Sequence, residues 1–272
     1  QLPARLTMPS ASSVKGRVPV VILVHGSGPS NMDEAMGPNA PFRDLAEGLS
    51  RRGVAVLRYD KRTFVCPQFF ENAKEGYTYD DETVDDAISA VRLVKDSLAK
   101  EKAIDPSRIY IVGHSMGGML APRIAQRSGE VAGLVLLAAP TGKLRPTMER
   151  QLAYLGRSAE EARQLTDLAL AEIPEVYLDM DARYSDTATA QNLNLPMLIL
   201  QGERDYQVTM DDYRTWREAV GSRQGVVMKS YPSLNHLFMA GKGGSMPEEY
   251  QTPGHVAEEV MDDIANFVLS GK

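Results

Sequence analysis

The sequence of 272 residues has a single cysteine, Cys66, and no long hydrophobic run. One cysteine excludes a disulfide within the chain and any metal site built from several cysteines. No apolar stretch approaches the roughly 20 residues that a membrane-spanning helix needs, so no membrane span is predicted. Positive charge is not in excess, because the formal net charge is −6, and this argues against nucleic acid as a partner.

Repeats, low-complexity tracts and long linkers are also absent from the sequence. Its contents of apolar residues (43%) and charged residues (24%) are ordinary for a globular protein, and we predict a single domain over residues 1–272. The chain begins with Gln1 instead of methionine. We therefore expect a processed form, which leaves export to the periplasm or the medium open.

Six short apolar runs have the composition of buried β-strands. They are nearly continuous and mostly rich in β-branched residues, as expected for strands that helices cover on both faces. The runs lie at residues 18–24, 55–59, 109–112, 134–138, 197–200 and 226–231. Apolar residues with helical spacing lie between them, at 42–49, 84–94 and 256–268. This alternation predicts an α/β fold with a mainly parallel sheet and helices on both faces.

Residues 141–193 interrupt this alternation, because they contain no strand pattern and have leucines and alanines at spacings that suggest short helices. An insertion between two parallel strands, at the carboxyl edge of the sheet, would lie over a site there. We therefore predict a helical cap insertion at 141–193. The alternative is a packed helical appendage with no role in access to the site.

The clearest motif is Gly113-His114-Ser115-Met116-Gly117, which fits G-x-S-x-G with a strand pattern before it and a helical pattern after it. On such a sharp strand-to-helix turn, the serine backbone is strained and its hydroxyl is exposed above the sheet. We predict that Ser115 is a nucleophile and that the N–H of Met116, at the helix N-terminus, stabilises an oxyanion. The alternative is a glycine turn that merely contains a serine, which the two flanking patterns disfavour.

A serine hydroxyl needs a base to take its proton, and four histidines are available. His236 follows the last strand-like run, in a loop expected at the sheet edge where Ser115 lies. His25 is expected beside the oxyanion loop, and the side chain of His114 is expected to point away from the serine. His255 follows Pro-Gly at a helix start and is expected to be a cap or surface residue. We therefore predict His236 as the base, with His255 as the second choice.

The loop after the fifth strand-like run offers two acids, Glu203 and Asp205. Asp205 is favoured because Gly202 turns the chain and leaves this acid three residues further on, in the loop. Glu203 is expected to pair with a nearby cation. The order Ser115, Asp205, His236 is nucleophile, acid, histidine, which is typical of hydrolases with a mainly parallel sheet.

Four motifs together carry a family resemblance: VHGSGP at 24–29, GHSMGG at 113–118, QGERD at 201–205 and NHLF at 235–238. With them the chain resembles the α/β-hydrolases over about residues 18–269, and in particular the bacterial branch related to dienelactone hydrolases and acyl-CoA thioesterase/acyltransferase proteins. The resemblance implies an α/β-hydrolase fold with an eight-stranded, mostly parallel sheet whose first strands are antiparallel. It also implies that the N–H of Ser27 is the second oxyanion donor.

Four residues near the predicted nucleophile are assigned to substrate binding: His25, Gly26, His114 and Phe64. Many α/β-hydrolases continue the second strand-like run as Asp-x-Arg-Gly-x-Gly, whereas this chain reads DKRTFV at 60–65, which predicts a differently shaped loop. Phe64 and the aromatic residues after it (Phe69, Phe70 and Tyr77) are expected to line an acyl or aryl pocket. The alternative is that they are buried as ordinary core.

These observations predict a serine hydrolase that cleaves carboxylic esters or thioesters of small molecules through an acyl-enzyme. No metal and no organic cofactor is predicted, because the sequence contains neither H-E-x-x-H nor a dinucleotide-binding glycine motif after a strand. The alternatives are an acyltransferase or a small peptidase with the same triad, and a binding protein that has lost catalysis.

Overall fold

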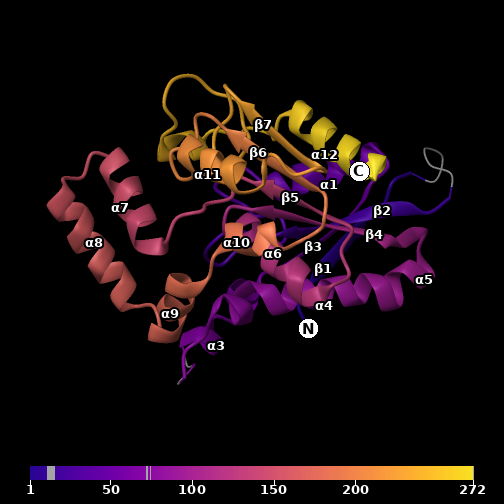
Figure 1. Cartoon of the computed structure of the whole chain (residues 1–272), viewed down its shortest axis with the longest axis horizontal. Helices are drawn as coiled ribbons and strands as arrows, with labels where there is room; N and C mark the ends of the chain where they lie inside the picture. The colour runs from indigo at the N-terminus through magenta and orange to yellow at the C-terminus, as the bar shows by residue number, and fades with distance from the viewer. Residues whose placement is uncertain (11–15, 72, 74, 272) are drawn as a thin grey trace.

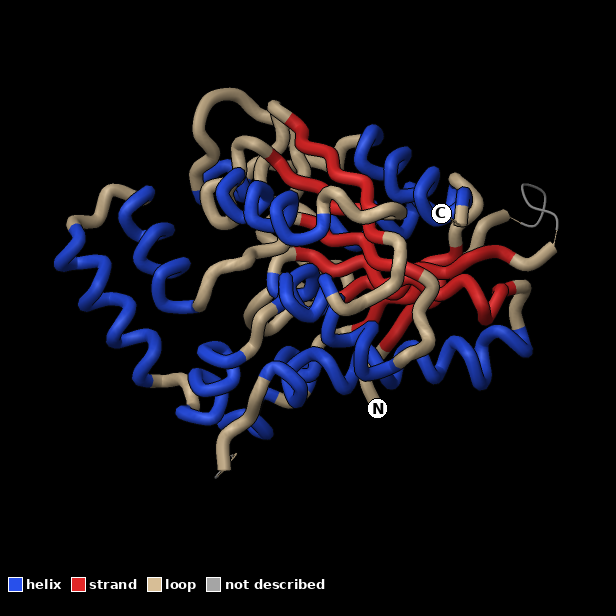
Figure 2. The backbone as a smooth tube through the Cα atoms, viewed as in Figure 1, coloured by secondary structure: helices blue, strands red, loops and turns tan. Residues whose placement is uncertain are grey.

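The computed structural model describes residues 1–10, 16–71, 73 and 75–271, apart from the side chains of Phe69 and Glu71. Its centre is a twisted sheet with helices on both faces (Figures 1 and 2). The strands are β1 (Ala4–Thr7), β2 (Val18–Val24), β3 (Ala55–Tyr59), β4 (Ile104–His114), β5 (Gly133–Leu137), β6 (Met197–Gly202) and β7 (Val226–Tyr231). They lie in the order β1-β3-β2-β4-β5-β6-β7.

The predicted α/β fold with a mainly parallel sheet is confirmed, since only β1 runs antiparallel to its neighbour, β3. The predicted number of eight strands is wrong, because the sheet has seven strands in the described part of the chain. In that part, a single edge strand, β1, precedes β2, where the family resemblance implied more than one. Strand β4 also begins earlier than predicted, at Ile104, which pairs with Val18 through a register shift that no apolar pattern reveals.

Two layers of helices cover the sheet because successive strand side chains point to opposite faces. Val21 and Leu23 of β2 pack in one core with α1 (Pro41–Arg51) and α12 (Glu258–Ser270). Val20 and Ile22 pack in a second core on the other face. The helices of that face are α4 (Asp85–Leu93), α6 (Met116–Ser128) and α11 (Met210–Val220).

The rest of the chain consists of short helical segments around these layers. Two of them, α2 (Arg62–Val65) and α3 (Pro67–Glu71), follow β3. A π-helical turn (Asp80–Val84) leads into α4, and a second one (Val94–Leu98) leads into α5 (Ala99–Glu101). A 3₁₀ turn (Pro247–Gln251) precedes α12. Within the part of the chain that the structure describes, no helix combines the length and apolar character needed to cross a membrane.

Residues 141–193, between β5 and β6, contain four helices. They are α7 (Leu144–Tyr154), α8 (Ala159–Ala171), α9 (Glu175–Arg183) and α10 (Asp186–Gln191). Of these, α7, α8 and α9 extend beyond the carboxyl edge of the sheet, whereas α10 packs against α6 and α11 (Figure 1). Helix α8 begins with a capping box in which the side chains of Ser158 and Glu161 satisfy each other's backbone N–H groups. Helix α7 is held to the body through Arg150, which lies 3.0 Å from Asp212 of α11.

Candidate active site

Ser115 forms the sharp corner between β4 and α6. Its backbone dihedral angles are φ 53° and ψ −120°, a conformation that residues with a Cβ rarely adopt. The Ser115 N–H donates a hydrogen bond of 2.9 Å to the carbonyl of Leu137 at the end of β5. The strained corner is therefore tied to the neighbouring strand, which keeps the hydroxyl at the carboxyl edge of the sheet.

The glycines that flank this corner are required by close backbone contacts. A Cβ at Gly113 would lie 2.2 Å from the carbonyl oxygen of Gly117. A Cβ at Gly117 would lie 2.2 Å from the carbonyl oxygen of Val24 in β2. Both neighbours are backbone atoms, which cannot move aside as a flexible side chain would, so the close packing of β2, β4 and α6 depends on these two glycines.

The loop after β2 passes directly beside the serine. A Cβ at Gly26 would lie 3.1 Å from the Cβ of Ser115. Ser27, the next residue, lines the same cavity as Ser115. The N–H of Met116 is the first in α6 and so has no carbonyl partner within that helix. This arrangement places at the start of α6 an N–H that has no partner within the helix, and it brings a second loop close to the same hydroxyl.

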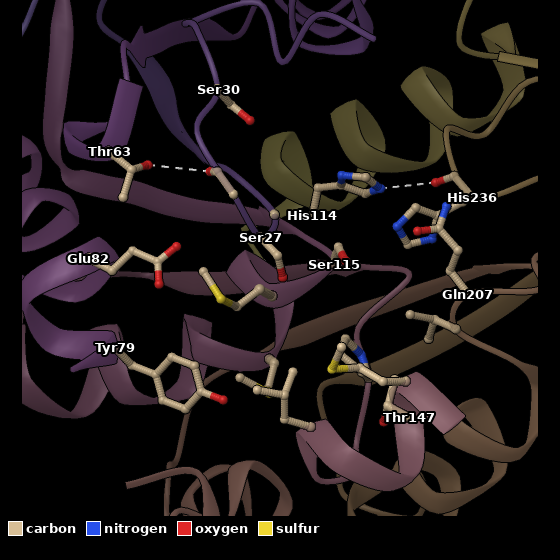
Figure 3. A pocket seen from close by; sticks show the side chains of 18 of the residues that line it. Ser27, Ser30, Thr63, Tyr79, Glu82, His114, Ser115, Thr147, Gln207 and His236 are labelled. Atoms are coloured by element: carbon tan, nitrogen blue, oxygen red, sulfur yellow. Dashed lines mark hydrogen bonds between the residues drawn. The ribbon is translucent and has the colours of Figure 1, made fainter. Parts of the chain in front are cut away.

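A cavity of about 570 Å³ lies in front of Ser115 (Figure 3). This volume falls within the range of sites for small molecules. Gly26, Ser27, His114, Met116 and His236 contribute to its wall from the body of the protein. The segment 141–193 contributes several further lining residues, among them Leu144, Met148, Gln151, Ile173, Tyr177 and Asp181.

His236 and Asp205 form a buried pair at this cavity. Nδ1 of His236 lies 2.6 Å from Oδ2 of Asp205. The other oxygen of Asp205 accepts hydrogen bonds from the backbone N–H groups of Gln207 (2.8 Å) and Val208 (3.0 Å). In the tautomer in which Nδ1 donates to the carboxylate oxygen, Nε2 is the ring nitrogen that can accept a proton.

The imidazole of His236 also lies close to the serine corner. Its ring centroid is 4.7 Å from that of His114, the residue before Ser115. Figure 3 shows Ser115 and His236 facing the same cavity. The structure thus brings together the three residues that the sequence predicted to act together, from three separate loops.

The other candidates for acid and base lie elsewhere. Glu203 is exposed and accepts a hydrogen bond of 2.7 Å from the hydroxyl of Ser230, not a bond from a cation as expected. The side chain of His255 is 82% exposed and lies 3.1 Å from Asp44 on α1. Of the two acids and four histidines weighed from the sequence, only Asp205 and His236 form a buried carboxylate–imidazole pair at the end of β6.

Of the four residues assigned to substrate binding, Gly26 and His114 line the cavity, whereas His25 and Phe64 do not. His25 packs beneath the loop, with Nε2 3.0 Å from the carbonyl of Asn31, and burial lowers its pKa to about 4. Phe64 is 51% exposed, because the short helix α2 turns its ring to solvent. The expectation that these two side chains contact substrate is therefore corrected.

The aromatic residues after Phe64 have different surroundings. Tyr77 lines the cavity, and its ring packs edge-to-face against that of Phe70 at a centroid distance of 4.7 Å. The side chain of Phe69 lies outside the described residues. Of the side chains in this group that the structure describes, Tyr77 is the one that lines the cavity.

A second buried pair, Glu34 and His114, was not predicted from the sequence. Oε2 of Glu34 lies 2.9 Å from Nδ1 of His114, and Oε1 accepts a hydrogen bond of 2.7 Å from the N–H of Gly26. Nε2 of His114 lies 2.9 Å from the carbonyl of His236 (Figure 3). The pair therefore links the loop after β2, the serine corner and the backbone of His236. Glu34 lies in an irregular loop, and no motif in the sequence marks it.

Each member of this pair shifts the pKa of the other toward its charged form. Burial alone lowers the pKa of His114, but the Glu34 carboxylate outweighs burial and raises that pKa above its ordinary value of 6.5. Burial alone raises the pKa of Glu34, but the His114 charge holds that pKa below its ordinary value. A charged His114 donates from both ring nitrogens, which suits its contacts with a carboxylate and a carbonyl.

The Glu34→Gln variant is expected to lose stability in a pH-dependent way. The folded-state pKa of His114 is raised, so its contribution is fully present below the unfolded value of 6.5 and is lost as pH rises through the folded value. The difference in free energy of unfolding between wild type and variant should therefore shrink as the pH rises above 6.5. Urea denaturation across this range measures it.

The Asp44→Asn variant is the control, because it also removes a carboxylate beside a histidine. Solvent screens that pair, since the His255 side chain is 82% exposed, and the loss should be small at every pH. A stability loss in Glu34→Gln that is constant over the pH range would contradict a charged His114. His25 becomes neutral on folding in both proteins at these pH values, so its contribution cancels in the difference.

No group of three or more histidine, cysteine or acidic residues is arranged to hold a metal ion within the described ranges 1–10, 16–71, 73 and 75–271. The carboxylates of Asp205 and Glu34, which could act as metal ligands, are instead bonded to other groups of the protein. Asp205 binds His236, and Glu34 binds His114 and Gly26.

Comparison with known proteins gives consistent matches. A family model described as "Alpha/beta hydrolase family" matches residues 21–263. The chain is 40% identical to esterase EstD of Thermotoga maritima, over 98% of this chain and 65% of that protein. The chain therefore spans less than two thirds of this relative's length.

Solved structures match over nearly the whole chain. An esterase of Pyrococcus furiosus, Pf2001, matches with a TM-score of 0.63 and 19% identity, over 99% of this chain and 91% of the other. Est1E of Butyrivibrio proteoclasticus, solved with ferulic acid bound, matches with a TM-score of 0.59 and 17% identity, over 99% and 95%. At these identities, the solved structures show a common fold alone.

Proposed function

The chain belongs to the alpha/beta hydrolase family, and from this premise we propose that it is a serine carboxylesterase in which Ser115 forms an acyl-enzyme. The observation that carries the proposal is the contact of 2.6 Å between His236 and Asp205 at the cavity that Ser115 lines. The identity of 40% to an esterase over almost the whole chain also supports it. The substrate would be a small ester or thioester that fits a cavity of about 570 Å³.

In the first half of the reaction, Nε2 of His236 takes the hydroxyl proton of Ser115 as its oxygen attacks the ester carbonyl. Asp205 holds Nδ1–H, which fixes the tautomer and stabilises the imidazolium that forms. The C–O bond of the leaving group then breaks, and His236 returns the proton to the departing alcohol. In the second half, His236 activates a water molecule, which releases the acid and restores Ser115.

The negative charge of the tetrahedral intermediate would be stabilised by the backbone N–H groups of Ser27 and Met116. These groups are fixed before the substrate arrives, so they need not reorganise during the reaction. Loss of one such donor costs about 3 kcal/mol of transition-state stabilisation, or roughly 10²–10³ in kcat.

The test of the proposed function is a panel of 4-nitrophenyl esters from acetate to laurate, together with a feruloyl ester, an acyl-CoA and a peptide anilide. We expect ester turnover that requires Ser115. Two results would contradict the proposal. One is hydrolysis of the peptide anilide without hydrolysis of any ester, and the other is transfer of the acyl group to an added alcohol without release of the free acid.

We also propose that residues 141–193 form a cap that shapes the substrate cavity. Met148 of α7 lines the cavity, and the Met148→Ala variant should make room at that wall. The ratio of kcat/KM for octanoate to that for acetate should then rise about tenfold, because a few methylenes in an apolar pocket are worth about 1–3 kcal/mol.

The control is Met246→Ala, which removes a methionine that is 41% exposed and does not line this cavity. An unchanged ratio in both variants would show that the segment is an appendage without influence on the substrate.

A further inference from the structure

A buried lysine lies behind the loop that follows β2. Lys61 is 2% exposed and directly follows β3 and Asp60. Its Nζ donates a hydrogen bond of 2.8 Å to the carbonyl of Gly26 and lies 2.6 Å from Oε1 of Glu82. Burial of an ammonium group is costly unless it is paired and hydrogen-bonded, so both contacts are needed to keep Lys61 in this position.

The carbonyl of Gly26 and the N–H of Ser27 belong to the same peptide group. That group is planar and trans, so its C=O and N–H bonds point in opposite directions. The ammonium of Lys61 holds the oxygen, and Glu34 holds the preceding N–H of Gly26. The direction of the Ser27 N–H is therefore set by two buried charges. Lys61 is not among the residues that line the cavity in front of Ser115, whereas Glu34 is one of them.

Glu82 extends this network to the segment 141–193. Its second oxygen accepts a hydrogen bond of 2.7 Å from the hydroxyl of Tyr177 on α9. Burial, and next the charge of Glu82, raises the pKa of Tyr177 well above its ordinary value, so the hydroxyl keeps its proton and donates. Figure 3 shows Glu82 on the opposite side of the cavity from His236, with Ser27 and Ser115 between them.

The contacts thus form a chain from α9 to the oxyanion loop: Tyr177 to Glu82, Glu82 to Lys61, and Lys61 to Gly26. We propose that Lys61 is a positioning residue for the Ser27 N–H. We also propose that Tyr177, acting through Glu82, makes the orientation of this N–H depend on how α9 packs against the body of the protein. The inference rests on the proposed function, because it assigns the Ser27 N–H to the oxyanion. It predicts that a contact in the cap controls the chemical step.

The test compares Lys61→Met, Tyr177→Phe and the double variant with the wild type, using 4-nitrophenyl butyrate. Lys61→Met should lower kcat by about 10²-fold and Tyr177→Phe by about tenfold, because the oxyanion is stabilised only in the transition state. KM should change less than about threefold in each. The double variant should match Lys61→Met alone, because Tyr177 acts through the lysine.

The control is Tyr184→Phe. This variant also removes a hydroxyl that joins the cap to the body, because the Tyr184 hydroxyl donates a hydrogen bond of 3.2 Å to the carbonyl of Met119. Tyr184 does not belong to the chain of contacts that leads to Gly26. Its kcat should stay within about twofold of the wild-type value. A merely structural role of Tyr177 would lower kcat equally in Tyr177→Phe and Tyr184→Phe.

Several results would overturn the inference. They are a wild-type kcat in folded Lys61→Met, a change confined to KM, or effects that multiply in the double variant. If Lys61→Met does not fold, the comparison of kcat between Tyr177→Phe and Tyr184→Phe tests the inference, and equal values in the two variants would overturn it. A failure of the proposed function looks different, because the wild type would then hydrolyse no ester or would keep its activity without Ser115.

Discussion

The Ser115→Ala variant is expected to lose ester turnover by about 10⁶-fold in kcat while its fold is retained. The variant removes the oxygen that we propose forms the acyl-enzyme, and it leaves the N–H groups of Ser27 and Met116 in place. A residual acceleration of about 10³–10⁴ over the reaction in water should remain from the oxyanion site and from substrate binding. Hydrolysis of a 4-nitrophenyl ester measures both quantities.

Retention of the fold is expected because alanine replaces serine without adding atoms to the crowded corner. Alanine at φ 53° bears the same backbone strain as the serine it replaces. The matched control is Ser128→Ala, at the far end of the same helix, α6, which should keep full activity. A Ser115→Ala variant with more than about 1% of wild-type kcat would show that the nucleophile lies elsewhere.

The Asp205→Asn variant is expected to lose about 10⁴ in kcat. An amide can accept the Nδ1 proton less well, and it offers an N–H that favours the tautomer with its proton on Nε2, where the serine proton must go. It also lacks the charge that stabilises the imidazolium. The thermal unfolding midpoint should be recorded beside kcat, because Asp205 also accepts two backbone hydrogen bonds.

Glu203→Gln is the matched control for this variant. It makes the same chemical change two residues away, on an exposed side chain that contacts Ser230. Its kcat should remain within about threefold of the wild-type value. If Glu203→Gln caused the large loss and Asp205→Asn did not, the assignment of the acid would be reversed.

The serine corner could be predicted from the sequence because its requirements are local. The glycines at 113 and 117 avoid backbone contacts within a few residues of Ser115 or with the neighbouring strand. Most strands could also be predicted from the sequence, because their buried side chains form continuous apolar runs. Strands β1 and β4 are exceptions. No apolar run marks residues 4–7, and in β4 the residues 105–108 separate Ile104 from the apolar run that begins at Ile109.

The buried pairs Lys61–Glu82 and Glu34–His114 could not be predicted, because each joins residues far apart in the chain and no motif marks the pairing. Lys61 and Glu82 come from different elements, and Tyr177 comes from a third. The sequence did show that the loop at 60–65 departs from the pattern of many relatives, but not that its lysine turns inward to Gly26. Phe64, in the same loop, was expected in the cavity and points to solvent, because helix α2 is too short and exposed to bury it.

The central claim is that the buried imidazole of His236 makes the hydroxyl of Ser115 a nucleophile, and covalent labelling with a fluorophosphonate tests it most directly. Mass spectrometry of the treated protein should show one phosphonyl group, on the peptide that contains Ser115. Labelling should be at least about 10³-fold slower in His236→Ala, because the base is then missing. An unlabelled wild type, a label on another residue, or equally fast labelling of folded His236→Ala would contradict the account.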